Sequence, residues 1–157
     1  MIDFELYQQV QDFYQDYAMS IDSEQWDKWI DFFVEDCVYK IQSRDNFDNN
    51  FPLSALALSS KGMLKDRIYG ITETIYHEHY YQTHVVSTPR ILKVTENHIE
   101  SEARYAVFRT KQDGIAEVYN VGRYIDRLVR VDGKLLIESR RCIFDNEMIL
   151  NSMIYPI

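Results

Sequence analysis

The chain has 157 residues, a net charge of −8 and twelve tyrosines. This length suits one domain with a single core, and we expect it to span residues 1–157. The acidic balance argues against nucleic-acid binding. No apolar run approaches the roughly 20 residues that cross a bilayer, and the acidic start lacks a signal-peptide pattern, so we expect a cytoplasmic protein without a membrane partner.

The first third of the chain predicts two helices and a strand. Apolar residues recur at helical spacing over Phe4–Ile21. Asp22 is then placed to cap a short second helix at about Ser23–Phe33, with Gln25 reaching back as in a capping box. Alternating apolar residues indicate a strand over Cys37–Gln42.

The next stretch is less regular. Ser43–Ser59 is rich in turn residues, and Pro52 argues against a central strand. Several apolar side chains in this loop need a cover, so it is a candidate contact element. Ser59 or Ser60 is then expected to cap a third helix that runs to about Tyr76.

The second half predicts long strands joined by tight turns. The Asp-Gly pairs at residues 113–114 and 132–133 favour hairpins, and residues 95–97 form a third turn. The strands are expected at Tyr81–Val94, His98–Lys111, Ile115–Val131 and Lys134–Phe144.

Both faces of Val118–Arg130 mix large apolar groups with charges. We therefore expect one face to cover the helices and the other to meet a partner or line a cavity. Gly122 in mid-strand indicates a bend or bulge. The sequence predicts an α+β cone in which about three N-terminal helices pack on a long, strongly curved antiparallel sheet.

One cluster could suggest a metal site. His77-Glu78-His79, with His84 further on, could form a two-histidine, one-carboxylate iron site with Asp31 or Glu78. The spacing does not match the H-E-x-x-H zinc pattern, so a polar helix-to-strand junction is the favoured interpretation.

The cysteines indicate neither a cluster nor a disulfide. Cys37 and Cys142 have no histidine near them in the sequence, whereas a Rieske centre needs two cysteines and two histidines. We expect both thiols to be small buried apolar residues.

A general acid–base pair is a second hypothesis. Asp31 and His84 could both face the cavity of the cone, with Tyr39 or Tyr119 assisting, and a histidine oriented by a carboxylate suits proton abstraction or dehydration. The competing interpretation places Asp31 on the helix surface and His84 in an interface or the core, and it is the favoured one.

Arginines gather late in the chain. They can pair across strands with Asp126 and Glu138, or they can anchor an interface, and the sequence leaves both interpretations open. The interface candidates are Arg123, Arg127, Arg140, Arg141 and, in the apolar tail, Tyr155.

Nearly the whole chain resembles the small (beta) subunit of bacterial aromatic-ring-hydroxylating (Rieske) oxygenases. The resemblance looks closest to the branch of salicylate 5-hydroxylase and the anthranilate and terephthalate oxygenases. The segments that carry it are Phe13–Ala18, Trp26–Phe33, Met63–Tyr69, Tyr81–Ile91 and Asp145–Ile157.

The resemblance implies an NTF2-like cone without catalytic residues of its own. It also implies a large (alpha) subunit that carries a Rieske [2Fe-2S] cluster and a mononuclear Fe(II), with electrons from NAD(P)H through a reductase. The family commonly forms hexamers of three large and three small subunits, so trimeric self-association is expected.

The resulting hypothesis is a non-catalytic structural subunit of an oxygenase that acts on a substituted benzoate. Its contact elements would be the 43–59 loop and the tail, so deletion of Met153–Ile157 should weaken assembly. The alternatives are a stand-alone dehydratase or isomerase that uses Asp31 and His84, and a module that binds an apolar ligand.

Overall fold

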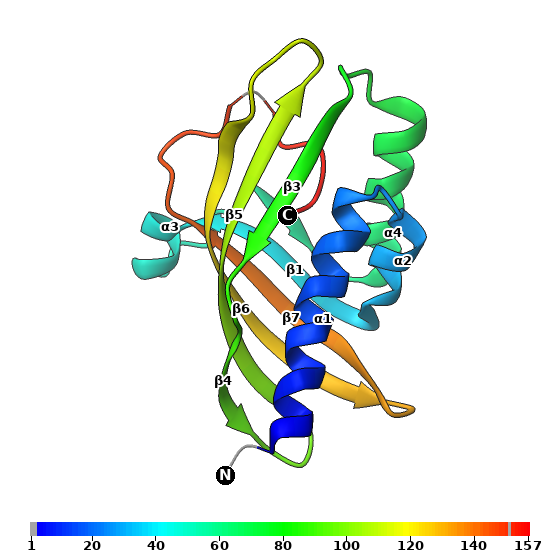
Figure 1. The fold of residues 1–157 in the computed structure, drawn as a ribbon, viewed down its shortest axis with the longest axis vertical. Coiled ribbons are helices and arrows are strands. Elements are labelled where there is room, and N and C mark those ends of the chain that lie inside the picture. Colours follow the sequence, from blue (N-terminus) through cyan, green and yellow to red (C-terminus); the bar gives the residue numbers. More distant parts are fainter. Residues whose placement is uncertain (1–2, 151) are drawn as a thin grey trace.

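The computed structural model describes residues 3–150 and 152–157. Three helices and a π-helical turn lie on the concave face of one strongly curved sheet, and a further short helix lies against its opposite face (Figure 1). The elements are α1 (Phe4–Asp22), α2 (Trp26–Asp31), β1 (Phe33–Ser43), α3 (Arg44–Asp48), β2 (Leu56–Leu58), α4 (Lys61–Tyr69), the π-helical turn η1 (Gly70–Thr74), β3 (Tyr80–Val86), β4 (Arg90–Val94), β5 (Ile99–Lys111), β6 (Glu117–Val131) and β7 (Lys134–Phe144).

The seven strands form one sheet in the order β2-β1-β7-β6-β5-β3, with β4 also pairing with β5. Most neighbours are antiparallel, as predicted, but β1 and β7 run parallel, with Tyr39 opposite Arg140. The expectation of an antiparallel sheet is therefore wrong for this pair. Strands that are distant in the sequence meet here, so no hairpin fixes their relative direction.

The long strand predicted at Tyr81–Val94 is divided in two. Ser87 exchanges hydrogen bonds with Arg104 of β5, its N–H donating to the Arg104 carbonyl at 2.9 Å and its Oγ accepting from the Arg104 N–H at 2.9 Å. Pro89 then lies between β3 and β4 and has no N–H to donate to a ladder. Both pieces still pair with β5, so one edge of the sheet bends at this point.

The predicted hairpins are confirmed. Asp132 and Gly133 have φ values of 50° and 81° between Val131 and Lys134, which face each other.

A side chain at Gly122 would be impossible without a shift of the backbone, since a Cβ there would lie 1.9 Å from the Ile143 carbonyl oxygen. Gly122 thus lets β6 and β7 approach closely where the sheet curves.

The junction of α1 and α2 differs from the prediction. Asp22 is the last residue of α1 and does not cap α2, whose N-cap position is Gln25, with no side-chain hydrogen bond. The capping box is absent because the Asp22 carboxylate binds the distant strand β3 instead. The chain reverses at Glu24, which has a φ of 53°, and α2 is shorter at both ends than predicted.

The third predicted helix is confirmed at its start and modified at its end. Ser60 caps α4, and its Oγ accepts a hydrogen bond from the Met63 N–H at 3.2 Å. The helix ends at Tyr69 and widens into η1, which stops at Thr74. The 43–59 segment is more ordered than predicted, because it contains α3 and the edge strand β2.

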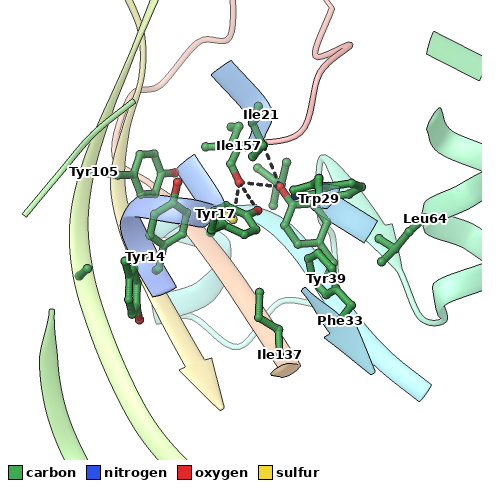
Figure 2. Close-up of a cluster of buried hydrophobic side chains, with 14 of the residues drawn as sticks. Tyr14, Tyr17, Ile21, Trp29, Phe33, Tyr39, Leu64, Tyr105, Ile137 and Ile157 are labelled. Carbon is green, nitrogen blue, oxygen red and sulfur yellow. Dashed lines mark hydrogen bonds between the residues drawn. The ribbon is translucent and has the colours of Figure 1, made fainter. Parts of the chain in front are cut away.

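The core lies between the concave face of the sheet and the helices (Figure 2). It is unusually rich in tyrosine, and Tyr14, Tyr17, Tyr39 and Tyr124 are fully buried. Both cysteines are buried and unbonded, as predicted. No helix of the described residues is long and apolar enough to cross a membrane. The predicted fold class, an α+β cone with a long, curved sheet, is confirmed.

Candidate functional site

A buried ion pair lies at the centre of the cone. Arg140 of β7 donates two hydrogen bonds to Asp126 of β6, from Nε to Oδ1 at 2.9 Å and from Nη2 to Oδ2 at 2.6 Å. Both side chains are fully buried. The guanidinium also lies over three tyrosine rings, with centroid distances of 3.9 Å to Tyr17, 4.4 Å to Tyr124 and 5.0 Å to Tyr14.

These neighbours stabilise the charged form of Arg140. Burial lowers the pKa of Arg140, but the Asp126 carboxylate, together with Tyr17 and Tyr14, more than offsets this effect and holds that pKa well above its usual value. The ion pair is bidentate, and its two hydrogen bonds replace hydrogen bonds to water that both charged groups lose on burial. Pairing across strands with Asp126 was one of the two interpretations that the sequence left open for the late arginines, and the sequence did not show that the pair is internal.

A second polar pair joins α1 to β3. Both oxygens of Asp22 accept from His84, Oδ2 from the backbone N–H at 2.8 Å and Oδ1 in a 2.5 Å contact with Nδ1. The His84 side chain is fully buried, and its Nε2 has no partner among the described residues. Nearby Gln82, on the same face of β3, is also buried, and in the same part of the chain neither of its amide atoms has a partner. The carboxylate fixes the orientation of the ring.

The structure does not bring His84 and Asp31 together, and it agrees with the favoured interpretation, in which Asp31 lies on the helix surface and His84 is buried. The side chain of Asp31 is 80% exposed, and its nearest cation is Lys61, at 4.0 Å. Asp31 lines a surface cleft of about 580 Å³ between α1, α2 and the start of β7. The residue that does bind His84 is Asp22. Its position at the end of a helix was visible in the sequence, but a carboxylate there is equally well explained as the cap of the next helix.

The histidine-rich junction does not converge on one point. His77 Nε2 lies 3.1 Å from the Tyr155 hydroxyl, whereas His79 pairs with Glu24 and Glu78 with Lys111. Among the described residues, no group of three or more His, Cys, Asp or Glu side chains is placed to hold a metal ion. These residues therefore do not fit the predicted iron site, because each side chain is directed to its own partner.

Two of the predicted interface residues are internal. Arg140 has no exposed surface, and Tyr155 is 4% exposed and packs on Trp26 and Tyr80. Neither side chain is available at the surface of this chain. Tyr119, proposed as a helper in acid–base chemistry, is also buried, beneath the guanidinium of Arg109, and its hydroxyl donates to the Ser152 carbonyl at 3.3 Å.

The other three candidate arginines, Arg123, Arg127 and Arg141, lie on the convex face of the sheet, opposite α1, α2 and α4. Arg127 pairs with Glu138 at 2.7 Å, as predicted, and remains accessible. Arg123 lies over the Phe47 ring of α3 at 5.7 Å. Arg141 is exposed and lies opposite Ile125 of β6.

Apolar side chains accompany these arginines. We call this surface the outer sheet face and define it as Tyr81, Thr83, Val85, Arg104, Ala106, Phe108, Val118, Val121, Arg123, Ile125, Arg127 and Arg141. Tyr81 is 66% exposed, and Val85 and Val118 are each 57% exposed. Helices α1, α2 and α4 all lie on the opposite side of the sheet (Figure 1). The outer sheet face therefore carries exposed apolar side chains and arginines, together with the acidic Glu102 opposite Ile125 and Glu138 beside Arg127.

Comparison with known proteins identifies the family. Residues 3–141 match the SnoaL-like domain family. The chain is 30% identical to the anthranilate 1,2-dioxygenase small subunit of Burkholderia cepacia over 142 residues, which cover 90% of this chain and 88% of the relative. It is 31% identical to a terephthalate 1,2-dioxygenase terminal oxygenase beta subunit of Comamonas sp., with 90% of this chain and 92% of the relative covered.

Solved structures agree with this result. A crystal structure from Novosphingobium aromaticivorans, described as the beta subunit of an aromatic-ring-hydroxylating dioxygenase, superimposes with a TM-score of 0.88 at 32% identity, covering 96% of both chains. The benzoate 1,2-dioxygenase beta subunit of Burkholderia mallei shares the fold, with a TM-score of 0.76 at 16% identity, covering 94% of this chain and 93% of that one. The chain belongs to the SnoaL-like domain family and, within it, to the small subunits of aromatic-ring-hydroxylating dioxygenases.

Proposed function

We propose that this chain is the non-catalytic structural subunit of a cytoplasmic Rieske oxygenase that acts on a substituted benzoate. Its large subunit would hold the Rieske [2Fe-2S] cluster and the mononuclear iron, and a reductase would supply electrons from NAD(P)H. The small subunits would associate as a trimer within a three-plus-three hexamer. The named activities of the relatives, on anthranilate and terephthalate, support the substrate class.

The structural role is supported mainly by the outer sheet face. An uncovered surface with large apolar side chains and arginines is typical of a protein interface. Two rows cross three strands of it, Thr83–Phe108–Val118 and Val85–Ala106–Val121. Residues in such rows present one continuous surface, since directly opposite side chains lie on the same side of a sheet.

The segment between α3 and β2 presents further exposed apolar side chains. Phe51 is 54% exposed and Leu53 is 71% exposed, although both are large and apolar. Their backbone is held in place, because the Phe51 carbonyl accepts from Gln42 at 2.8 Å and the Leu53 carbonyl from Asn46 at 3.2 Å. A rigid loop that presents apolar side chains supports the proposal that the 43–59 segment contacts a partner.

The test is recovery of the assembly from the native cells with an affinity tag on this chain. We expect a large subunit at roughly equal stoichiometry that contains iron and shows a Rieske absorption spectrum. The double variant Tyr81→Lys/Val85→Lys places two charges on the outer sheet face. We expect it to stay folded and to lose most of its partner, because burial of unpaired charges is costly.

The matched control is Phe4→Lys/Met19→Lys on α1, on the other side of the sheet. Phe4 is 75% exposed and Met19 is 63% exposed, so this variant adds the same charge to an equally open surface. It should retain the assembly. Equal recovery of partner by both variants would contradict the role of the outer sheet face, and a colourless, iron-free chain that is recovered alone would contradict the subunit proposal.

The stand-alone enzyme requires a separate test. His84→Ala would abolish an activity of the isolated chain if His84 were its base. The proposed structural role predicts that the purified chain has no such activity in a screen of dehydratase and isomerase substrates. Any turnover by the isolated chain that His84→Ala removes would count against that role.

A further inference from the structure

The last residues of the chain lie inside the cone. Residues 152–157 adopt neither helix nor strand, yet Ile157 has no exposed surface and Tyr155 is only 4% exposed. Figure 2 shows Ile157 among the core side chains, between α1 and the strand that carries Tyr39. The tail therefore occupies space that the sheet and helices enclose.

The backbone of Ile157 is bound by side chains in the way that a ligand is bound. Its carbonyl oxygen accepts from the hydroxyls of Tyr17, on α1, and Tyr39, on β1, each at 2.8 Å. Its N–H donates to the Tyr39 hydroxyl at 2.8 Å, and the Cys142 Sγ lies 3.8 Å from the carbonyl oxygen. Three different elements thus converge on one residue.

The donors around this oxygen are neutral at physiological pH. Burial raises the pKa of Tyr17 to about 12, although Arg140 and the Trp29 N–H act in the opposite direction. Burial also raises the pKa of Tyr39 well above its usual value. The indole of Trp29 is also fully buried, and its N–H acts on the Tyr17 hydroxyl, so the two tyrosine hydroxyls are the oxygen donors that the tail uses.

The rest of the tail is held by side chains as well. The Tyr155 ring packs on Tyr80 with centroids 4.6 Å apart and on Trp26 at 5.3 Å. Nearer the surface, Arg67 Nη2 donates to the carbonyls of Met153 and Ile154 at 2.6 Å and 2.9 Å. The tail belongs to no sheet ladder, so it can leave without breaking a strand pair.

From these contacts we infer that the cone contains a ligand pocket that the chain closes with its own residues 155–157. In the vacated pocket, Tyr17 and Tyr39 would donate to a carbonyl or carboxylate oxygen. The aromatic wall formed by Trp26, Tyr80 and their neighbours would take a small apolar body. The pocket therefore suits a small branched aliphatic or aromatic acid or amide, which has the chemistry of the tail itself.

The experiment uses a chain truncated after residue 151 and the free peptide of residues 152–157. Titration calorimetry should show saturable 1:1 binding of the peptide to the truncated chain and at least tenfold weaker binding to the full chain, whose site is filled. The probe 4-methylpentanoate, an aliphatic body with one carboxylate, should displace the peptide. Failure of a folded truncated chain to bind the peptide, or of the probe to displace it, would overturn the inference.

Variants of the truncated chain locate the site. Tyr17→Phe/Tyr39→Phe removes both hydroxyls and keeps both rings, and it should weaken peptide binding by roughly tenfold or more, because each hydrogen bond contributes about two- to tenfold. Tyr76→Phe is the control, since Tyr76 is fully exposed. Equal affinities of the two variants would place the peptide elsewhere.

Hydrogen exchange in the full chain keeps the inference testable if the truncated chain does not fold. The Ile157 amide should exchange through a local opening, at least tenfold faster than core amides of β6, and Tyr39→Phe should speed this exchange because it removes the acceptor of that N–H. Exchange of Ile157 only with global unfolding would show that the tail never leaves the pocket, and would overturn the inference.

Discussion

At the scale of single residues, the cone is organised by polar groups that its aromatic core encloses. Arg140 and Asp126 neutralise each other where no water reaches them, and three tyrosine rings surround the guanidinium. One nitrogen of Arg140, Nη1, has no partner among the described residues. A buried charge pair of this kind contributes little stability of its own, but loss of one member leaves the other charge unpaired.

We therefore expect Arg140→Ala to lower the free energy of unfolding by about 3–5 kcal/mol, because Asp126 would remain buried without a counter-charge. Urea denaturation measures this change. The double variant Arg140→Met/Asp126→Leu should recover most of the loss, since it removes both charges. The control Arg127→Ala breaks the exposed pair with Glu138 and should cost less than about 1 kcal/mol. A double variant as unstable as the single one would show that the charges themselves are required.

At the scale of elements, Asp22 connects the end of α1 to the middle of β3. Its carboxylate binds the backbone and the side chain of His84, 62 positions further along the chain. This contact orients the first helix on the edge of the sheet. It also accounts for the absence of a side-chain cap on α2.

Asp22→Ala should destabilise the fold by about 1–3 kcal/mol, because it leaves the His84 N–H and Nδ1 buried without an acceptor. The loss should be accompanied by faster hydrogen exchange in β3 than in β6. Asp16→Ala, an exposed change on the same helix, is the control and should be nearly neutral. Unchanged protection of β3 in the Asp22 variant would contradict the proposed connection.

The sequence predicted those elements whose signals are local. The Asp132-Gly133 turn, the Ser60 cap and the bounds of β7 follow from residues next to one another, and each is confirmed. The parallel pairing of β1 with β7 is set by contacts that are about 100 residues apart, so no local pattern could show it.

The candidate site was harder to predict for the same reason. A carboxylate at a helix end looks the same whether it caps the next helix or binds a distant strand, which is why Asp22 was misread. An arginine in a strand looks the same whether it faces a partner or an internal carboxylate, which is why the sequence left both interpretations open for Arg140. The burial of Tyr155 depends on where the tail folds back, and its apolar composition suited an external contact equally well.

At the scale of the whole molecule, the tyrosine-rich core makes stability sensitive to alkaline pH. Burial raises the pKa of Tyr17 and of Cys142 to about 12, from ordinary values near 10 and 9. The folded chain therefore holds protons that the unfolded chain loses. The contribution of these groups to the free energy of unfolding is fully present below about pH 9. It falls as the pH rises toward 12, by about 1.4 kcal/mol per pH unit for each such group.

Urea denaturation at pH 8, 10 and 11 should show this decline, with tyrosinate absorbance appearing together with unfolding. Cys142→Ala should flatten the decline between pH 9 and 10, where the thiol contributes before the tyrosines. A free energy of unfolding that stays constant up to pH 11 would contradict the buried, protonated state of these groups.

The parallel pairing of β1 with β7 has a consequence for the order in which the chain can fold during its synthesis. The N-terminal helices and β1 leave the ribosome first, but the neighbour that places β1 in the sheet is made only after residue 134. Until then, β1 has only the short strand β2 beside it, and the apolar side of α1 has no complete sheet to cover. The growing chain must therefore keep an aromatic surface in solution until β7 emerges, and we expect its yield to depend on chaperones and on translation speed.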